Sequence, residues 1–265
     1  MINHSFAVMA YEDSPYLSEC LDSLKNQTVE SKIYITTSTP SAYISELAKK
    51  YAVEVYVTEP GQGIAHDWYF SLQQAKTKYV TLAHQDDLYM PAYAASSFTT
   101  AEKFADTLIS FTGYTELVVG RDRTNTLLLR VKRFMLWFFM PFRKNIRSRS
   151  RKKFLLSAGC PIPAPSVMYN KNILADFRFS NEFSINMDWQ AWYRIANMTG
   201  RFVYINKRLL KHRIHPDSAT SLGLKSNLRQ KEDLIMFKKF WPGFIAKLLG
   251  KLYARSYKSN DKLQT

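Results

Sequence analysis

One stretch of the sequence, residues 79–91, constrains the fold more than any other. It begins as an apolar run of strand type (79–83), ends abruptly in the polar cluster His84-Gln-Asp-Asp87, and is followed by Pro91, which opens a helix. In open α/β sheets, ligands bind at the carboxyl ends of the strands. Two adjacent carboxylates at such a place repel each other unless a cation or a proton lies between them. Oxygen ligands of this kind suit Mg²⁺ or Mn²⁺ held together with substrate phosphates.

The same stretch has a second interpretation. It is also typical of a solvated turn in which an Asp side chain caps the helix that begins near Pro91. Spacing alone does not separate this structural role from metal binding, so the decision depends on the rest of the chain.

Strands and helices alternate through the first half of the chain. Besides the central strand, we expect short strands at 6–10, 33–36, 53–57, 108–112 and 113–120. We expect helices from residue 14, over 41–51, after Gly63 and over 91–104; the first has the apolar face Leu17, Cys20, Leu21 and Leu24. Such alternation means βαβ units and a mostly parallel sheet. The predicted fold class is therefore a doubly wound α/β fold.

The composition is that of a folded protein with a sizeable core. A chain of 265 residues with 46% hydrophobic and 14% aromatic residues is not disordered. Its two cysteines, Cys20 and Cys160, cannot form a disulfide framework, so a reducing cytoplasm is the expected compartment. The N-terminus does not have the pattern of a signal peptide, and no apolar run approaches the roughly 20 residues that span a bilayer.

Charge is distributed very unevenly, although the net charge is +15. Residues 1–120 contain seven Lys, no Arg and fourteen Asp or Glu, whereas residues 121–153 contain twelve Lys or Arg and the single acidic Asp122. An acidic first half joined to a basic second half indicates two surfaces with different tasks. We divide the chain into an α/β half (1–120), a second half (121–223) with a basic amphipathic insert at 121–153, and a basic amphipathic helical tail (224–265).

Two segments of the basic part combine bulky apolar side chains with Lys and Arg. They are residues 127–142, which a basic run at 143–153 follows, and residues 240–253. An interfacial helix at an anionic membrane needs this combination. The first segment can equally be an ordinary core helix followed by a basic loop. Because the pattern occurs twice, we favour peripheral contact with an anionic membrane surface.

Three more segments carry residues suited to chemistry. Residues 158–169 form a proline-stiffened loop that enters a strand. Residues 184–196 predict a helix with Asp188 in its first turn, where a lone Asp is most often an N-terminal cap. Residues 210–220 contain Arg213 and His215 in the pattern Arg-x-His-x-x-Ser-x-Thr, and a lone His is usually a structural residue.

The order of these motifs resembles that of the family 2 glycosyltransferases, which have the GT-A fold and invert the anomeric centre. An α/β half that ends in an Asp pair precedes an Asp-Trp helix start and then Arg-x-His-x-x-Ser-x-Thr. Val8-Met-Ala-Tyr11 and Ser23-Leu-Lys-Asn-Gln-Thr28 look like the first strand and helix of that family, and Gly61-Gln-Gly-Ile-Ala65 also fits. The resemblance extends over residues 4–220.

The resemblance implies roles for individual residues. Asp86 matches the metal-binding Asp of the Asp-x-Asp motif, and His215 matches the distal histidine that approaches the diphosphate or the metal. Asp188 matches the base that takes the proton from the acceptor hydroxyl. The donor-binding residues are expected to be Ala10, Tyr11, Glu12, His84, Gln85 and Asp87. Trp189 and Arg213 are expected on the acceptor side.

The sequence departs from the family pattern at two places. His84 stands where the first Asp of Asp-x-Asp is usual, and the loop after the second strand reads Thr36-Thr-Ser-Thr39 instead of being Asp-rich. Acidic contacts to the ribose and the base are therefore missing from their expected positions. The Gln-x-x-Arg-Trp motif of processive synthases is absent, which predicts transfer of one sugar per acceptor.

We therefore predict an inverting glycosyltransferase of the GT-A type, assisted by Mg²⁺ or Mn²⁺, that acts on the cytoplasmic face of a membrane. Its donor is a nucleotide sugar, and its acceptor is a lipid-linked glycan or polysaccharide precursor, as in bacterial surface glycan assembly. One alternative is a non-catalytic basic protein that binds nucleic acid or membranes, but no signature of specific nucleic-acid recognition is present. The other is a sugar-nucleotide pyrophosphorylase, which would need a Gly-rich loop with a basic residue at 10–15.

Overall fold

The computed structural model describes residues 2–140, 142, 144–215 and 228–261, with side chains described up to residue 254. Ser218 and Thr220 of the predicted Arg-x-His-x-x-Ser-x-Thr motif lie outside these ranges. The first elements alternate as predicted: β1 (His4–Ala10), α1 (Leu17–Lys25), β2 (Lys32–Thr37), α2 (Ala42–Tyr51), β3 (Glu54–Val57), α3 (Ile64–Gln74) and β4 (Tyr79–His84).

The chain continues with β5 (Leu88–Tyr89), α4 (Tyr93–Ala101), β6 (Thr107–Val118), β7 (Arg121–Arg123) and α5 (Leu127–Phe139). These are followed by β8 (Asn145–Ile146), α6 (Arg149–Leu156), the 3₁₀ turn η1 (Ala164–Ser166) and β9 (Val167–Asn170). The last elements are α7 (Met187–Ala196), β10 (Arg201–Ile214), α9 (Leu228–Lys238) and α10 (Gly243–Asp261).

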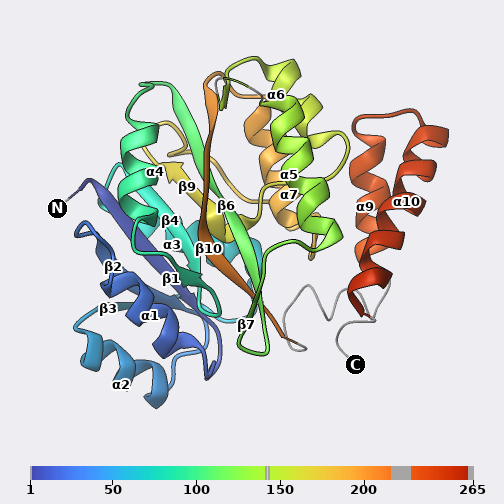
Figure 1. The fold of residues 1–265 in the computed structure, drawn as a ribbon. Helices are drawn as coiled ribbons and strands as arrows, with labels where there is room; N and C mark the ends of the chain where they lie inside the picture. Colours follow the sequence, from blue (N-terminus) through green and yellow to red (C-terminus); the bar gives the residue numbers. More distant parts are fainter. Residues whose placement is uncertain (1, 141, 143, 216–227, 262–265) are drawn as a thin grey trace.

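A mostly parallel sheet runs through both halves of the molecule (Figure 1). Its strand order in the described residues is β3-β2-β1-β4-β9-β6-β10-β5, and β7 and β8 pair with β6 and β10. β1, β2, β3 and β4 are mutually parallel. Because β9 is antiparallel to both β4 and β6, and β6 is parallel to β10, the carboxyl ends of β4 and β10 meet at the same edge. The predicted fold class is confirmed.

Two layers of helices cover the sheet. Apolar side chains of α1, α2 and α4 pack on one face, and those of α3, α6 and α7 pack on the other. The apolar residues of β1 alternate between the two clusters, with Phe6 and Val8 in one and Ala7 in the other, as a strand buried on both faces requires.

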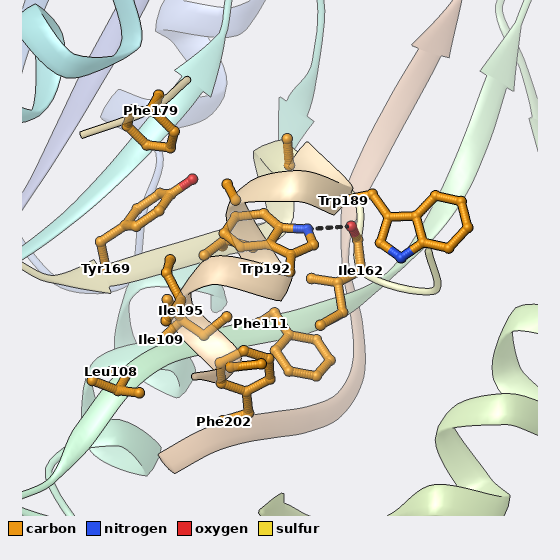
Figure 2. Close-up of a cluster of buried hydrophobic side chains, with 14 of the residues drawn as sticks. Leu108, Ile109, Phe111, Ile162, Tyr169, Phe179, Trp189, Trp192, Ile195 and Phe202 are labelled. Carbon is orange, nitrogen blue, oxygen red and sulfur yellow. Dashed lines mark hydrogen bonds between the residues drawn. The ribbon is translucent and has the colours of Figure 1, made fainter. Parts of the chain in front are cut away.

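Two tryptophans fix α7 in the second layer. The indole N–H of Trp192 donates to the Ile162 carbonyl at 3.1 Å, and that of Trp189 donates to the Leu156 carbonyl at 3.0 Å. Both rings are fully buried, and Figure 2 shows the N–H of Trp192 directed at the Ile162 carbonyl oxygen. Because both polar atoms are satisfied in the core, the rotation of α7 about its axis is fixed, and with it the position of Asp188 in its first turn.

Most of the predicted elements are present, but one was wrong. The expected separate strand at 113–120 is the second half of β6, which continues through Gly113 without a turn. A Cβ atom at Gly113 would lie 3.1 Å from the carbonyl oxygen of Lys207, where β10 bulges. The glycine therefore marks a close approach of two backbones and does not end a strand.

The helices α9 and α10 are part of the packed structure. They stand beside α7, shown in red in Figure 1. Phe237 of α9 lies edge-on to Trp189 with 5.1 Å between ring centroids, and Tyr193 meets Phe240 at 5.2 Å. No helix in the described part of the chain combines the length and apolarity needed to cross a bilayer.

Gly200, between α7 and β10, allows a stability prediction. It has φ +132°, and a Cβ atom there would lie 2.6 Å from the Asp106 carbonyl oxygen. We expect Gly200→Ala to lower the free energy of unfolding by about 3 kcal/mol, from backbone strain and overpacking. Gly120→Ala is the control, because φ is +72° but a Cβ atom there meets nothing within 4 Å; it should cost only ~1 kcal/mol. Equal losses in urea unfolding would contradict this account.

Candidate active site

The two adjacent carboxylates after β4 have separate partners. Asp86 accepts a hydrogen bond from the Ser14 hydroxyl at 3.0 Å, and its other oxygen lies 3.2 Å from Nε2 of His215. His215 comes from the end of β10, 129 residues later in the sequence. The side chain of Asp86 is 26% exposed, so the carboxylate remains accessible to a ligand. The structure thus brings together the two residues that we predicted as metal ligands.

Asp87 is buried and has a supporting role. It lies 2.9 Å from Nδ1 of His212 and accepts the backbone N–H of Arg213 at 2.8 Å. Burial alone would raise the pKa of Asp87, but the charge of His212 and its hydrogen bond hold that pKa below the ordinary value. Burial alone would lower the pKa of His212, but the Asp87 carboxylate raises that pKa above its ordinary value. Asp87 is 1% exposed, so its contacts in the structure are those of a residue that supports the site.

Arg213 joins three segments around these carboxylates. Its Nε donates to the backbone carbonyl of Asp86 at 2.8 Å, and its Nη2 donates to Glu19 of α1 at 2.6 Å. The guanidinium lies over the ring of Tyr16, 4.2 Å from its centroid. Through these contacts the guanidinium of Arg213 holds the segments around the site together. None of them supports the acceptor-side role predicted for Arg213.

The expected donor-binding residues after β1 and β4 do come together. The side-chain amide of Gln85 pairs with the backbone of Tyr11, accepting its N–H at 3.0 Å and donating to its carbonyl at 2.9 Å. The N–H of Glu12 donates to Thr39, after β2, at 2.6 Å. Glu12 has the left-handed φ of 53°, so the chain turns sharply here. Ala10 is buried, whereas Tyr11 and Glu12 are exposed.

Sequence reasoning missed an acidic residue beside this loop. Asp67, in the first turn of α3, accepts a hydrogen bond from Ser38 at 3.2 Å. Its other oxygen, Oδ1, is buried and has no protein partner, and burial raises the pKa of this carboxyl. The neighbouring Trp68 lies 5.7 Å from the ring of His84, whose pKa burial lowers. The helical pattern of 64–75 did not single out Asp67, because its contact with Ser38, which follows a different strand, is not visible in the sequence.

Asp188 lies in the first turn of α7 and is half-buried. It does not cap the helix from outside, since the N-cap is Asn186; instead Oδ1 accepts the N–H of Trp189 at 2.6 Å. The thiol of Cys160 donates weakly to Oδ2 at 3.8 Å. Burial raises the pKa of Asp188, although the Trp189 N–H and the charges of Arg229 and Lys132 oppose the rise. A carboxylate with a raised pKa is a better proton acceptor than a carboxylate with the ordinary pKa.

Lys132 of α5 links this region to the Asp87 pair. Its charge lowers the pKa of Asp188 and also that of His212, so it lies within electrostatic reach of both. Trp189, predicted on the acceptor side, is fully buried with its N–H satisfied. That prediction was wrong because the Trp189 ring faces the core, where it anchors α7.

Asp86 and His215 fit a divalent cation only if substrate phosphates and water supply most of its ligands. No group of three or more His, Cys, Asp and Glu side chains in a metal-binding arrangement occurs in the described ranges. Asp86 and His215 offer one carboxylate and one imidazole, which suits Mg²⁺ or Mn²⁺ bound mainly by substrate phosphates and water. Neither Asp86 nor Asp87 caps α4, whose N-cap is Ala92, so the alternative interpretation as a helix cap was wrong.

Comparison with solved structures defines the class: the fold is that of the GT-A glycosyltransferases. The chain is similar to S. aureus TarS 1-349, with a TM-score of 0.63 and 12% identity over 97% of this chain and 72% of that one. It is also similar to the mannosyltransferase PcManGT from Pyrobaculum calidifontis in complex with GDP-Man and Mn²⁺, with a TM-score of 0.60 and 14% identity over 96% and 69% of the two chains. TarS 1-349 in complex with UDP-GlcNAc gives a TM-score of 0.64, with 12% identity and coverage of 97% and 73%.

The particular family follows from the sequence. The chain belongs to glycosyl transferase family 2, whose profile matches residues 5–164. No curated protein matches the sequence. Family and fold together support glycosyl transfer from a nucleotide sugar, and the predicted family is confirmed. Asp188 and His215 lie beyond the matched residues, so their roles rest on geometry.

The buried Asp87 allows a test of the site's framework. Asp87→Ala removes the partner of His212 and of the Arg213 N–H, so we expect the free energy of unfolding to fall by about 3–5 kcal/mol. Glu19→Ala removes only the 56% exposed partner of the same arginine and should cost less than about 1 kcal/mol. Urea unfolding of both variants checks this, and a small loss for Asp87→Ala would show that the pair does not hold the strands together.

Proposed function

We propose that this protein is an inverting, metal-assisted glycosyltransferase that transfers one sugar from a nucleoside diphosphate sugar to a hydroxyl of a membrane-associated acceptor. The observation that carries the proposal is the pairing of an accessible carboxylate, Asp86, with His215 at the edge where β4 and β10 end. A second carboxylate, Asp188, is half-buried in a different environment that raises its pKa. Two carboxylates in unlike environments suit two roles in one reaction.

Asp86 and His215 serve the leaving group. Departure of the nucleoside diphosphate leaves negative charge on its β-phosphate, and a bound Mg²⁺ or Mn²⁺ would neutralise that charge without a proton. Asp86 and His215 would hold the cation against the diphosphate. Asp87 keeps the loop that carries Asp86 attached to β10, through His212 and the N–H of Arg213.

The loop between β1 and α1 supports the donor nucleoside. Gln85 fixes the backbone of Tyr11, and the exposed Tyr11 ring offers a surface on which a base can stack. Asp67 compensates for the missing Asp-rich loop after β2, because its partnerless Oδ1 accepts an N–H from a base that enters beside Ser38. Uracil and guanine carry a ring N–H that can make this contact, whereas adenine and cytosine offer only an exocyclic amino group, so we expect a base with a ring N–H.

Asp188 serves as the base. The acceptor hydroxyl loses its proton as its oxygen attacks the anomeric carbon, and a carboxylate whose pKa burial has raised accepts that proton more readily. Attack from the side opposite the diphosphate, in a single displacement, inverts the anomeric configuration. The positive charges of Lys132 and Arg229 near Asp188 favour an acceptor that carries a phosphate or diphosphate, as lipid-linked glycans do.

Two substitutions separate these roles. Asp188→Asn should lower the transfer rate by a factor of roughly 100 to 10,000 while donor affinity stays unchanged, since the base acts only on the acceptor. Asp86→Asn should weaken Mn²⁺-dependent donor binding itself. Calorimetry of donor binding and a nucleotide-release assay measure the two effects. If both variants lost donor affinity equally, the assignment of Asp188 would be wrong.

The second part of our proposal is that an anionic membrane covers the exposed side of α5. Phe134, Trp137 and Phe138 are more than half exposed and contact one another, with ring centroids 5.8 and 6.1 Å from Phe134. On the next helix Phe154 is exposed, and it packs against Phe139 of α5. Arg130 on α5 and Arg147, Arg149 and Arg151 around the start of α6 are also exposed. Apolar rings bordered by arginines match a bilayer with anionic headgroups.

The helix α10 carries a second apolar stripe. Phe244, Leu248 and Leu252 recur every four residues and are each more than half exposed, with the exposed Lys247 and Lys251 beside them. Spacing of four residues puts these side chains on one face of the helix. The amphipathic character expected for 127–142 and 240–253 is therefore present, and it is directed partly outward.

Vesicle flotation tests the membrane contact. The protein should float with vesicles that contain phosphatidylglycerol at low salt, and the Phe134→Ala/Trp137→Ala/Phe138→Ala variant should bind at least about tenfold more weakly. High salt should also weaken binding, because it screens the arginines. Val57→Ala/Ile64→Ala, which removes exposed apolar side chains elsewhere, is the control. Absence of flotation of the unaltered protein at low salt would refute the membrane contact.

A further inference from the structure

The segment that leads into α7 is held by a carboxylate from far along the chain. Glu232 of α9 accepts the backbone N–H of Ser184 at 2.8 Å, that of Ile185 at 2.9 Å and that of Asn186 at 2.8 Å. Glu232 is 4% exposed. A buried carboxylate that accepts three backbone N–H groups makes charge-assisted hydrogen bonds, which are roughly twice as strong as neutral ones.

A neighbouring residue adds a fourth contact. Asp233 is 1% exposed and accepts the side-chain amide of Asn186 at 2.8 Å. Asn186 is the N-cap of α7, and its side chain makes no capping hydrogen bond to the helix. Adjacent acidic residues of α9 therefore supply what a local cap would supply elsewhere: acceptors for backbone N–H groups and negative charge at a helix N-terminus.

Apolar packing fixes α9 in this position. Met236 and Phe237 are buried, and Phe237 lies against Trp189, the residue that follows Asp188. The polar contacts lie immediately before Asp188 and the aromatic contact immediately after it. Residues 232–237 of α9 thus hold both sides of the residue that we assign as the base.

We propose that Glu232, assisted by Asp233, is a positioning residue for the transfer reaction: it fixes the 184–186 segment so that Asp188 faces the acceptor hydroxyl. This inference rests on the role of Asp188 in the proposed function. It also assigns a task to the C-terminal helices, because α9 completes the catalytic segment from outside the family-matched residues.

The magnitude of the effect follows from geometry. Misplacement of a reacting group by about 1 Å can cost a factor of about 100 in rate. Glu232→Gln keeps the shape of the side chain but replaces one carboxylate oxygen by an NH2 group, which cannot accept, so at least one of the three N–H groups loses its partner. We expect the transfer rate at saturating substrates to fall by about 100-fold, with donor affinity unchanged.

The pH profile distinguishes a residue that positions Asp188 from one that sets its pKa. The groups that act on Asp188 are Cys160, Lys132, Arg229, Tyr169 and the N–H of Trp189. Glu232 is not among these groups, so its replacement leaves the charged neighbours of Asp188 in place. The acidic limb of the rate profile should therefore keep its position in Glu232→Gln while the rate at saturating substrates falls, as expected for a residue that positions Asp188 without setting its pKa.

Lys231→Gln is the matched control, because Lys231 is the adjacent but exposed residue of α9. It should leave the rate and the pH profile unchanged. A pair of variants tests the Asp233 contact: Asn186→Asp sets two carboxylates against each other and should lower the rate. Asn186→Asp/Asp233→Asn restores one donor and one acceptor and should recover most of that loss.

The outcomes separate this inference from the proposed function. If Asp188→Asn kept full transfer activity, the proposed function would fail first. If Asp188→Asn were inactive while Glu232→Gln, folded by circular dichroism, matched Lys231→Gln in rate, the positioning role would be refuted. Loss of donor affinity in Glu232→Gln would also refute it, since the segment would then act on the donor side. If Glu232→Gln did not fold, the Asn186→Asp variants would decide. Recovery of the transfer rate in Asn186→Asp/Asp233→Asn would support the positioning role, and no recovery would refute it.

Discussion

The site depends on the ion pair between the buried Asp87 and the partly exposed His212. Asp87 follows β4, whereas His212 belongs to β10, and the antiparallel β9 lies between β4 and the parallel pair β6 and β10. The pair, with the Arg213 N–H, joins the two strand ends across the sheet. Because leaving the buried carboxylate of Asp87 without a partner is costly, the contact helps to determine where Asp86 and His215 meet. The accessible carboxylate can bind a ligand because its buried neighbour is fixed.

The site also illustrates how environment assigns roles to chemically identical groups. Asp86, Asp87 and Asp188 differ in burial and partners. Asp86 is accessible beside a histidine, Asp87 is buried in an ion pair, and Asp188 is half-buried near a thiol. Burial raises the pKa of Asp188, whereas His212 reverses that effect at Asp87. A proton acceptor and a structural anion therefore arise from the same side chain within one fold.

Local sequence patterns predicted the first half of the fold well, because each βα unit forms its own apolar stripe and its own turn. They also predicted Asp86, His215 and Asp188 as site residues at element ends, and the structure brings the first two together. Contacts between distant segments were not predictable in this way. Three features depend on how the helices pack: the hydrogen bonds from 184–186 to Glu232, the contact between Asp67 and Ser38, and the burial of Trp189. Helical periodicity shows which face of a helix is apolar but not which element packs against that face. The expected boundary between strands at 112 and 113 was wrong because the sequence does not show that Gly113 lies where the backbones of β6 and β10 approach closely.

The most direct test of the account is calorimetric titration of the protein with nucleoside diphosphates, with and without Mn²⁺. We predict that one of the diphosphates whose base carries a ring N–H, UDP or GDP, binds in a metal-dependent manner, and that Asp86→Asn abolishes the metal dependence. Binding of no nucleoside diphosphate under any condition would contradict the account, because the edge formed by β4 and β10 would then not be a donor site.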